Sequence, residues 1–81
     1  MHVTVKLFAR LREIAGAGDV GLNLGEGALV RDAWQALADR HRDIAPYASS
    51  VSCAVNEDYS RMTARLKEGD EIAFLPPVSG G

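Results

Sequence analysis

Residues 66–81 read LKEGDEIAFLPPVSGG, and this closing stretch decides where the folded domain ends. It opens with Lys67-Glu68-Gly69-Asp70, a run that is typical of a turn. Ile72 and Phe74 then alternate with other residues, which predicts a strand with one buried face. Pro76-Pro77 ends that strand, because proline donates no N–H to a sheet and biases the preceding residue toward extended geometry. The residues beyond the prolines must therefore leave the sheet.

The rest of the chain shows strand and helix patterns in turn. Period-two alternation predicts strands at residues 2–9, 19–24 and 51–55, with turn chemistry after the last of them at residues 56–58. Residues 11–15 repeat at helical spacing for barely one turn, so we expect a short helical turn or loop there. The longest pattern is an amphipathic helix over residues 29–42, whose buried stripe contains Val30, Ala33, Trp34, Leu37, Ala38 and His41.

The order strand, strand, helix, strand, strand predicts an α+β fold with two layers. One main helix would pack across a mixed sheet, and the first and last strands would lie side by side and parallel, as in β-grasp folds. Residues 1–75 are expected to form this single domain, and residues 76–81 an extended tail. A second domain would not fit in 81 residues.

Composition excludes several classes of function. The chain is 47% hydrophobic and 25% charged, which is ordinary for a globular protein. Its formal net charge is -2 and its basic residues are scattered, so we expect no nucleic-acid partner. No apolar run approaches the roughly 18 residues that a membrane helix needs, and the lone cysteine cannot form an internal disulfide. These features predict a soluble protein of the cytoplasm.

The tail Pro76-Pro77-Val78-Ser79-Gly80-Gly81 is the feature that carries chemistry. Six extended residues reach roughly 20 Å, far enough to enter the active site of another protein. The prolines stiffen its root and the glycines give its tip a small cross-section. The reactive group would be the carboxylate of Gly81, activated as a phosphoanhydride and then attacked by sulfur. The competing interpretation is a frayed terminus or a cloning scar.

The sequence resembles the small, sulfur-carrying subunit of molybdopterin synthase, a ubiquitin-like β-grasp protein. The resemblance runs along the whole chain and is sharpest in residues 66–81, where a Gly-Asp turn, an apolar strand, Pro-Pro-Val and Gly-Gly follow one another. Residues 7–13, LFARLRE, and residues 54–56, AVN, also resemble the family. One departure is Leu29, where many members carry a capping Thr or Ser; it affects only helix stability.

This resemblance implies a role in molybdenum cofactor biosynthesis. An E1-like enzyme would use ATP to adenylate Gly81, so the nucleotide would be bound by that partner and no cofactor by the carrier itself. A sulfur donor enzyme would then convert Gly81 to a thiocarboxylate. The large synthase subunit would use the tail as co-substrate and pass sulfur to cyclic pyranopterin monophosphate, with two carriers for each dithiolene. The implied complex is a heterotetramer, in which the chain is not catalytic alone.

Strand parity predicts a docking face for these partners. Phe8 and Leu75 fall opposite to the inward-facing residues of their strands, and Tyr59 follows the third strand's turn. These three side chains are expected to form an exposed apolar patch that meets both partners. The alternative is that they are isolated surface residues with no role.

Other residues that suggest chemistry are given structural roles. Cys53 and Trp34 are predicted to be buried, and His41 to end the main helix. His2 and His41 are too far apart for a metal site, and the acidic residues of both turns are expected to be solvated. Three alternatives stay open: a sulfur carrier for thiamine or amino-acid biosynthesis, a ubiquitin-like protein modifier, and a binding module with an accidental tail.

Overall fold

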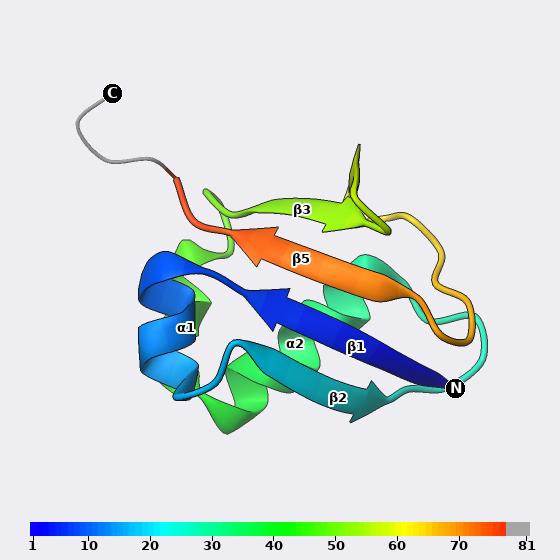
Figure 1. The fold of residues 1–81 in the computed structure, drawn as a ribbon, viewed down its shortest axis with the longest axis horizontal. Coiled ribbons are helices and arrows are strands. Elements are labelled where there is room, and N and C mark those ends of the chain that lie inside the picture. The colour runs from blue at the N-terminus through cyan, green and yellow to red at the C-terminus, as the bar shows by residue number, and fades with distance from the viewer. Residues whose placement is uncertain (78–81) are drawn as a thin grey trace.

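A computed structural model of the chain describes residues 1–77, which form one sheet with helices on one of its faces (Figure 1). The predicted tail residues Val78, Ser79, Gly80 and Gly81 lie outside the described residues. The elements follow in the order β1 (His2–Leu7), α1 (Ala9–Ala15), β2 (Asp19–Asn23), α2 (Val30–Arg40), the 3-10 helix η1 (Arg42–Tyr47), β3 (Ser52–Val55), β4 (Asp58–Ser60) and β5 (Glu71–Leu75).

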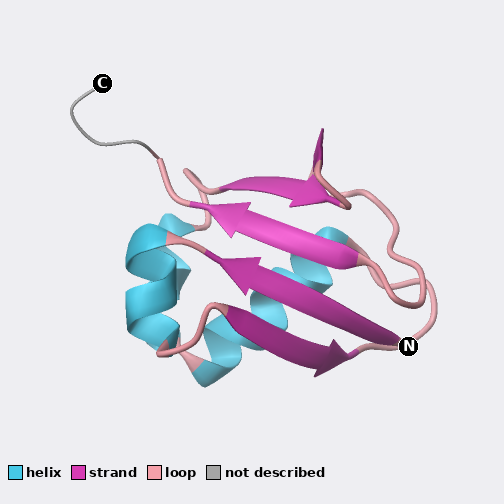
Figure 2. Ribbon diagram, in the orientation of Figure 1, coloured by secondary structure: helices cyan, strands magenta, loops and turns pink. Residues whose placement is uncertain are grey.

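The sheet is mixed and has the strand order β2-β1-β5-β3-β4. The central strands β1 and β5 run parallel, with Leu7 paired to Phe74, while β2, β3 and β4 pair antiparallel to their neighbours. Helix α2 crosses one face of the sheet, and α1 lies at the end where β1 and β5 finish (Figure 2). The predicted α+β architecture with parallel first and last strands is therefore confirmed.

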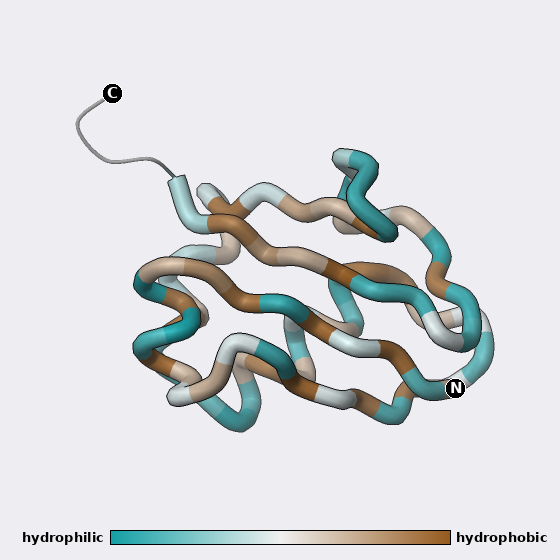
Figure 3. Tube along the Cα trace, viewed as in Figure 1, coloured by the Kyte–Doolittle hydropathy of each residue, from teal (hydrophilic) through white to brown (hydrophobic). Residues whose placement is uncertain are grey.

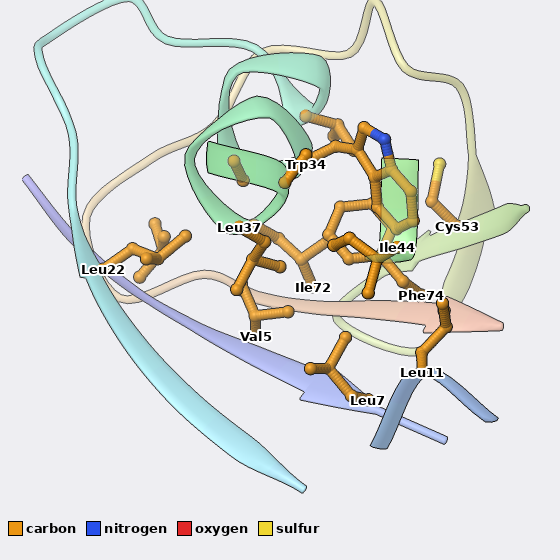
Figure 4. Packing of buried hydrophobic residues seen from close by; sticks show 14 of the residues in the cluster. Val5, Leu7, Leu11, Leu22, Trp34, Leu37, Ile44, Cys53, Ile72 and Phe74 are labelled. Carbon is orange, nitrogen blue, oxygen red and sulfur yellow. The ribbon is translucent and has the colours of Figure 1, made fainter. Parts of the chain in front are cut away.

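The core lies between α2 and the sheet, as the alternating patterns predict. Val3, Val5 and Ile72 are fully buried on the covered face, and hydropathy alternates along these strands in Figure 3. Figure 4 shows Trp34 reaching from α2 into this layer, where its ring meets that of Phe74 edge to face with centroids 5.0 Å apart. An aromatic pair of this geometry adds about 0.5–1.5 kcal/mol to the burial of apolar area. The prediction that Trp34 belongs to the core is confirmed.

Several predicted boundaries differ from those observed. The first strand ends at Leu7 rather than at residue 9, because the chain turns at Phe8 into α1. Helix α1 has 7 residues, longer than the single turn expected, and Gly16 ends it in the left-handed conformation at φ 74°. Helix α2 ends at Arg40 with His41 as its C-cap, so the predicted closing role of His41 is confirmed.

Strand β4 was not predicted, since its three residues are too few for a period-two pattern. It returns from β3 through Asn56 and Glu57, whose φ values of 50° and 73° are both positive. Positive φ at both central residues is the signature of a type I′ hairpin turn, which matches the natural twist of paired strands. Tyr59 therefore lies on an edge strand and not in a loop.

The expectation that every acidic turn residue is solvated is wrong for Asp70. Its side chain is buried, with 9% of the residue exposed, and it accepts hydrogen bonds from the Lys67 N–H at 2.8 Å and from Asn56 Nδ2 at 2.9 Å. Asn56 Oδ1 in turn accepts the Glu71 N–H at 3.0 Å. The Asp70–Asn56 pair thus ties the β3–β4 hairpin to the start of β5.

Candidate functional site

The parallel pairing of β1 and β5 brings two distant chain segments to the same end of the sheet, where both strands finish. Strand β1 ends at Leu7 and is followed by Phe8, and β5 ends at Leu75 and is followed by Pro76. In Figure 1, helix α1 also lies at this end of the sheet. Pro76 is half-buried and Pro77 is exposed, and each lacks the N–H that would extend the ladder. The root of the predicted tail is therefore set by the end of a buried central strand.

An apolar surface surrounds this root. Phe8 is 43% exposed, although residues on either side of it are held by β1 and α1. Its backbone is extended at φ -129°, and the next residue, Ala9, has a φ of 49°. A positive φ is unusual for alanine, and here it turns the chain from the strand into α1 while leaving the Phe8 ring outside. No sequence pattern predicts that conformation, because alanine is an ordinary helix residue.

Leu75 lies beside this position and is half-buried, whereas Tyr59 stands apart from the pair. Tyr59 pairs with Ala54, which pairs in turn with Ala73 of β5, so the aromatic ring is two strand spacings or about 10 Å away from β5. At 82% exposure it is the most accessible of the three predicted docking residues. The structure thus brings Phe8 and Leu75 together and connects them to Tyr59 through two alanines. We call these five residues the outer apolar strip, in which Ala54 is itself buried and Ala73 and Leu75 are half-buried: Phe8, Leu75, Ala73, Ala54 and Tyr59.

Charged side chains of β1, β2 and α1 lie near the strip, since Lys6 pairs with Ala73 across β1 and β5 and Asp19 pairs with Lys6. Arg10 Nη1 lies 3.2 Å from Glu13 Oε2, and both side chains are exposed. The hydrogen bond to this carboxylate is the main cause that raises the pKa of Arg10 above its usual value. The Arg10 side chain therefore stays charged at all physiological pH values. This pair lies in solvent and adds little to stability.

The prediction that Cys53 is buried is confirmed. Its Sγ donates to the Ser60 carbonyl at 3.3 Å, and burial raises the pKa of its thiol. Within residues 1–77, no three histidine, cysteine or acidic side chains gather closely enough to hold a metal ion. None of the helices in that same part of the chain is long and apolar enough to cross a membrane.

The two-layer fold with a parallel β1–β5 pair, and a chain that leaves from the end of β5, defines the ubiquitin-like β-grasp class. The family model described as ThiS family matches residues 5–81. The chain therefore belongs to the ThiS family.

Known proteins similar to the chain include both sulfur carriers and a protein modifier. The molybdopterin synthase sulfur carrier subunit of Chlamydomonas reinhardtii is 35% identical over 83 residues, which cover 100% of this chain and 100% of that protein. The crystal structure of SAMP1 from Haloferax volcanii has a TM-score of 0.89 and 30% identity, again with 100% of both chains covered. The fold is shared with a chain in the complex of subunits 1 and 2 of molybdopterin-converting factor from Helicobacter pylori, at TM-score 0.68, 22% identity and 100% coverage of both chains.

Proposed function

We propose that the chain is the sulfur carrier subunit of molybdopterin synthase, and that the carboxylate of Gly81 is the group that carries sulfur. The observation that supports this most is the position of the Pro76-Pro77 root, which follows directly on β5, a central strand that pairs in parallel with β1. The family match continues through residue 81, and the Chlamydomonas relative bears the corresponding name. Function would then reside in a projecting tail and a docking surface, and the chain would not be catalytic alone.

The proposed chemistry needs only the chain end and two activating proteins. A carboxylate oxygen of Gly81 attacks the α-phosphorus of ATP on an E1-like enzyme, and pyrophosphate leaves. A sulfur nucleophile at the oxidation level of sulfide, supplied by a donor enzyme, then attacks the carbonyl carbon and AMP leaves. The product is a thiocarboxylate. Because glycine has no Cβ, the carbonyl is open to attack from either face. The carrier holds no cofactor and no ATP of its own in this scheme.

The partner that receives the sulfur is proposed to be the large synthase subunit, in a cytoplasmic heterotetramer. The Helicobacter protein of the same fold occurs in a complex of subunits 1 and 2 of molybdopterin-converting factor. In our proposal the outer apolar strip docks on the large subunit and the tail enters its active site. Sulfur then passes to cyclic pyranopterin monophosphate, and water releases the Gly81 carboxylate for another round.

Tandem mass spectrometry of the C-terminal peptide tests the carrier chemistry. The protein is incubated with the E1-like enzyme, ATP and a sulfur donor, and fragmentation then locates any exchange of sulfur for oxygen. Fragmentation is needed because oxidation of a methionine adds nearly the same mass. Exchange at Gly81 supports the proposal, and an unmodified Gly81 beside a converted control carrier contradicts it.

Two variants test whether a free carboxylate at a fixed reach is required. Deletion of Gly81, or addition of one alanine after it, should abolish sulfur transfer to the pterin precursor and leave the melting temperature unchanged. Full activity in either variant would refute the proposed role of Gly81.

The docking surface is tested separately by substitution of Phe8. Phe8→Ala should weaken binding to the large subunit, while Arg40→Ala on the opposite layer, where Arg40 is exposed at the end of α2, should not. Tyr59→Ala tests whether the strip extends to β4. Equal binding by wild type and Phe8→Ala would show that the strip is not part of the interface.

A second candidate function is protein modification, and the similarity to SAMP1 favours it. A modifier would form amide bonds between Gly81 and lysines of other proteins after the same adenylation. ATP-dependent conjugates of higher mass, with no sulfur transfer to the pterin precursor, would establish this alternative. A sulfur carrier for thiamine-type synthesis would give the thiocarboxylate but would not bind the large synthase subunit.

A further inference from the structure

A hollow of about 280 Å³ lies where β1, α1 and the start of β2 meet. The loop after α1 returns to β1 here, because the Leu7 N–H donates to the Gly18 carbonyl at 2.8 Å. Lys6 and Asp19 are paired across β1 and β2 and belong to the outward-facing residues of those strands. The hollow is lined by Lys6, Leu7, Phe8, Arg12, Gly18 and Asp19.

The charges of this hollow do not balance. Lys6 Nζ lies 3.2 Å from Asp19 Oδ1, so these two residues neutralise each other. Arg10 on the same helix pairs with Glu13 at 3.2 Å. Within residues 1–77, Arg12 lies within 4.0 Å of no carboxylate and its side chain donates no hydrogen bond. The guanidinium of Arg12 is therefore a surplus positive charge in the wall of the hollow.

The loop leaves room for this guanidinium. A Cβ on Gly18 would lie 3.2 Å from Arg12 Nε and 3.4 Å from Arg12 Cζ, closer than ordinary contacts. Gly18 does not have a positive φ, so its backbone does not itself demand glycine. A side chain at this position would instead require the guanidinium of Arg12 to shift by a few tenths of an ångström. The position of the guanidinium is thus shaped by both α1 and the loop that follows it.

The chemistry of the hollow suits one acidic side chain better than a small-molecule cofactor. Ligand pockets generally enclose about 300–1,000 Å³, and this hollow lies at the lower limit of that range. A planar guanidinium can hold a carboxylate through two parallel hydrogen bonds, and the exposed Phe8 ring offers apolar contact to the stem of such a side chain. Phe8 also belongs to the outer apolar strip. Any protein that covers the strip at Phe8 will therefore reach the hollow.

We propose that this hollow receives a glutamate or aspartate side chain of the docking partner, with Arg12 as its ligand. This inference rests on the proposed function, since it takes the outer apolar strip as the docking surface. The strip would supply apolar contact area, and Arg12 would fix the orientation of the carrier through a directional ion pair. Orientation matters because a tail of fixed length reaches the partner's active site only when the carrier is docked in one orientation.

The test measures binding of the full chain to the large synthase subunit by calorimetry at two salt concentrations. Arg12→Gln should weaken binding about tenfold or more, because it removes a charged hydrogen-bonded pair, and should reduce the salt dependence of the dissociation constant. Arg12→Lys keeps the charge but lacks the planar guanidinium, so its affinity should lie between those of wild type and Arg12→Gln. Arg61→Gln is the matched control, since Arg61 is exposed and does not line the hollow.

Gly18→Ala tests the geometry independently of the charge. The added Cβ displaces the guanidinium, so we expect weaker binding in the wild-type background and no further loss in the Arg12→Gln background. If replacement of a glutamate or aspartate of the large subunit with arginine weakens binding of the wild-type carrier, Arg12→Glu should restore that binding.

The outcomes separate this inference from the function on which it rests. Normal binding by wild type together with equal binding by Arg12→Gln overturns the inference and leaves the carrier function intact. Wild type that neither binds the large subunit nor becomes thiocarboxylated overturns the proposed function, and the inference with it. Thermal unfolding of Arg12→Gln and Arg12→Lys should match wild type, because Arg12 is exposed and its side chain makes no hydrogen bond or ion pair within residues 1–77.

Discussion

Asp70→Asn is the most informative single substitution, because the Asp70 carboxyl group is buried and held by two donors. Asp70 accepts from the Lys67 N–H at 2.8 Å and from Asn56 Nδ2 at 2.9 Å, while Asn56 Oδ1 accepts from the Glu71 N–H at 3.0 Å. In Asp70→Asn the new amide can still accept from Lys67, but its NH₂ then faces the NH₂ of Asn56. If Asn56 flips to relieve this, its NH₂ faces the Glu71 N–H instead. In the first arrangement a part-buried donor loses its acceptor, and in the second the mismatch moves to the exposed side of Asn56, where water satisfies part of it.

The expected loss follows from that single mismatch. Leaving a buried polar group unsatisfied costs about 1–3 kcal/mol. The mismatch is only part-buried, so the lower end of this range, about 1 kcal/mol, applies. For a domain of this size, each 1 kcal/mol lowers the melting temperature by about 4–8 °C, so Asp70→Asn should melt roughly 4–8 °C lower than wild type. Asn56→Asp should be destabilised at least as much, because two carboxylates then face each other.

The exchange of both residues supplies the control. In the double variant Asn56→Asp/Asp70→Asn, the amide of residue 70 donates to the new carboxylate at residue 56. The Lys67 and Glu71 N–H groups keep oxygen acceptors. Urea denaturation should therefore show that the double variant is more stable than the sum of the single variants predicts, by about 1–3 kcal/mol. A double variant whose loss is simply additive, or an Asp70→Asn variant with unchanged stability, would refute this account of the turn.

Three further predictions concern the core, the thiol and the last turn. Trp34→Ala should lower the free energy of unfolding by about 3–5 kcal/mol, since it leaves a cavity against Phe74, whereas Gln35→Ala on the exposed side of α2 should change it by less than about 0.5 kcal/mol in the same urea titration. Burial raises the pKa of Cys53 in the folded state, so its contribution to stability is complete below the unfolded thiol pKa and is lost as pH rises through the folded one. Cys53→Ala should therefore flatten the alkaline decline of unfolding free energy, and an identical decline would contradict this assignment. Gly69 has a φ of 83°, so Gly69→Ala should cost about 1–2 kcal/mol by thermal unfolding, whereas Gly25→Ala, at ordinary φ and in open space, should be neutral.

The interior of the fold was predictable because its signals are local. Inward alternation at Val3 and Val5, helical spacing around Trp34 and the Pro76-Pro77 stop each depend on residues a few positions apart. These patterns predicted four of the strands, the main helix and the point where the last strand ends. The predicted docking residues Phe8 and Leu75 came from the same alternation, and both lie where parity places them.

Boundaries and short elements were less predictable. The left-handed conformation of Ala9 moves the end of β1 and creates the exposed position of Phe8, yet alanine carries no sign of it. Strand β4 has three residues, and its existence depends on pairing with β3 rather than on its own composition. Local propensity is weak over so few residues, so neighbouring structure decides.

By itself the sequence determined the fold class, the buried face of each long element and the place where the last strand ends. Only the tertiary structure decided that Asp70 is buried, that Arg12 and Gly18 share a hollow, and that Tyr59 is continuous with Leu75 through two alanines. The physical reason is the separation of the groups involved. Alternation and helical spacing are properties of neighbouring residues, whereas a buried carboxylate needs a donor from a segment that only the folded sheet brings within hydrogen-bonding distance.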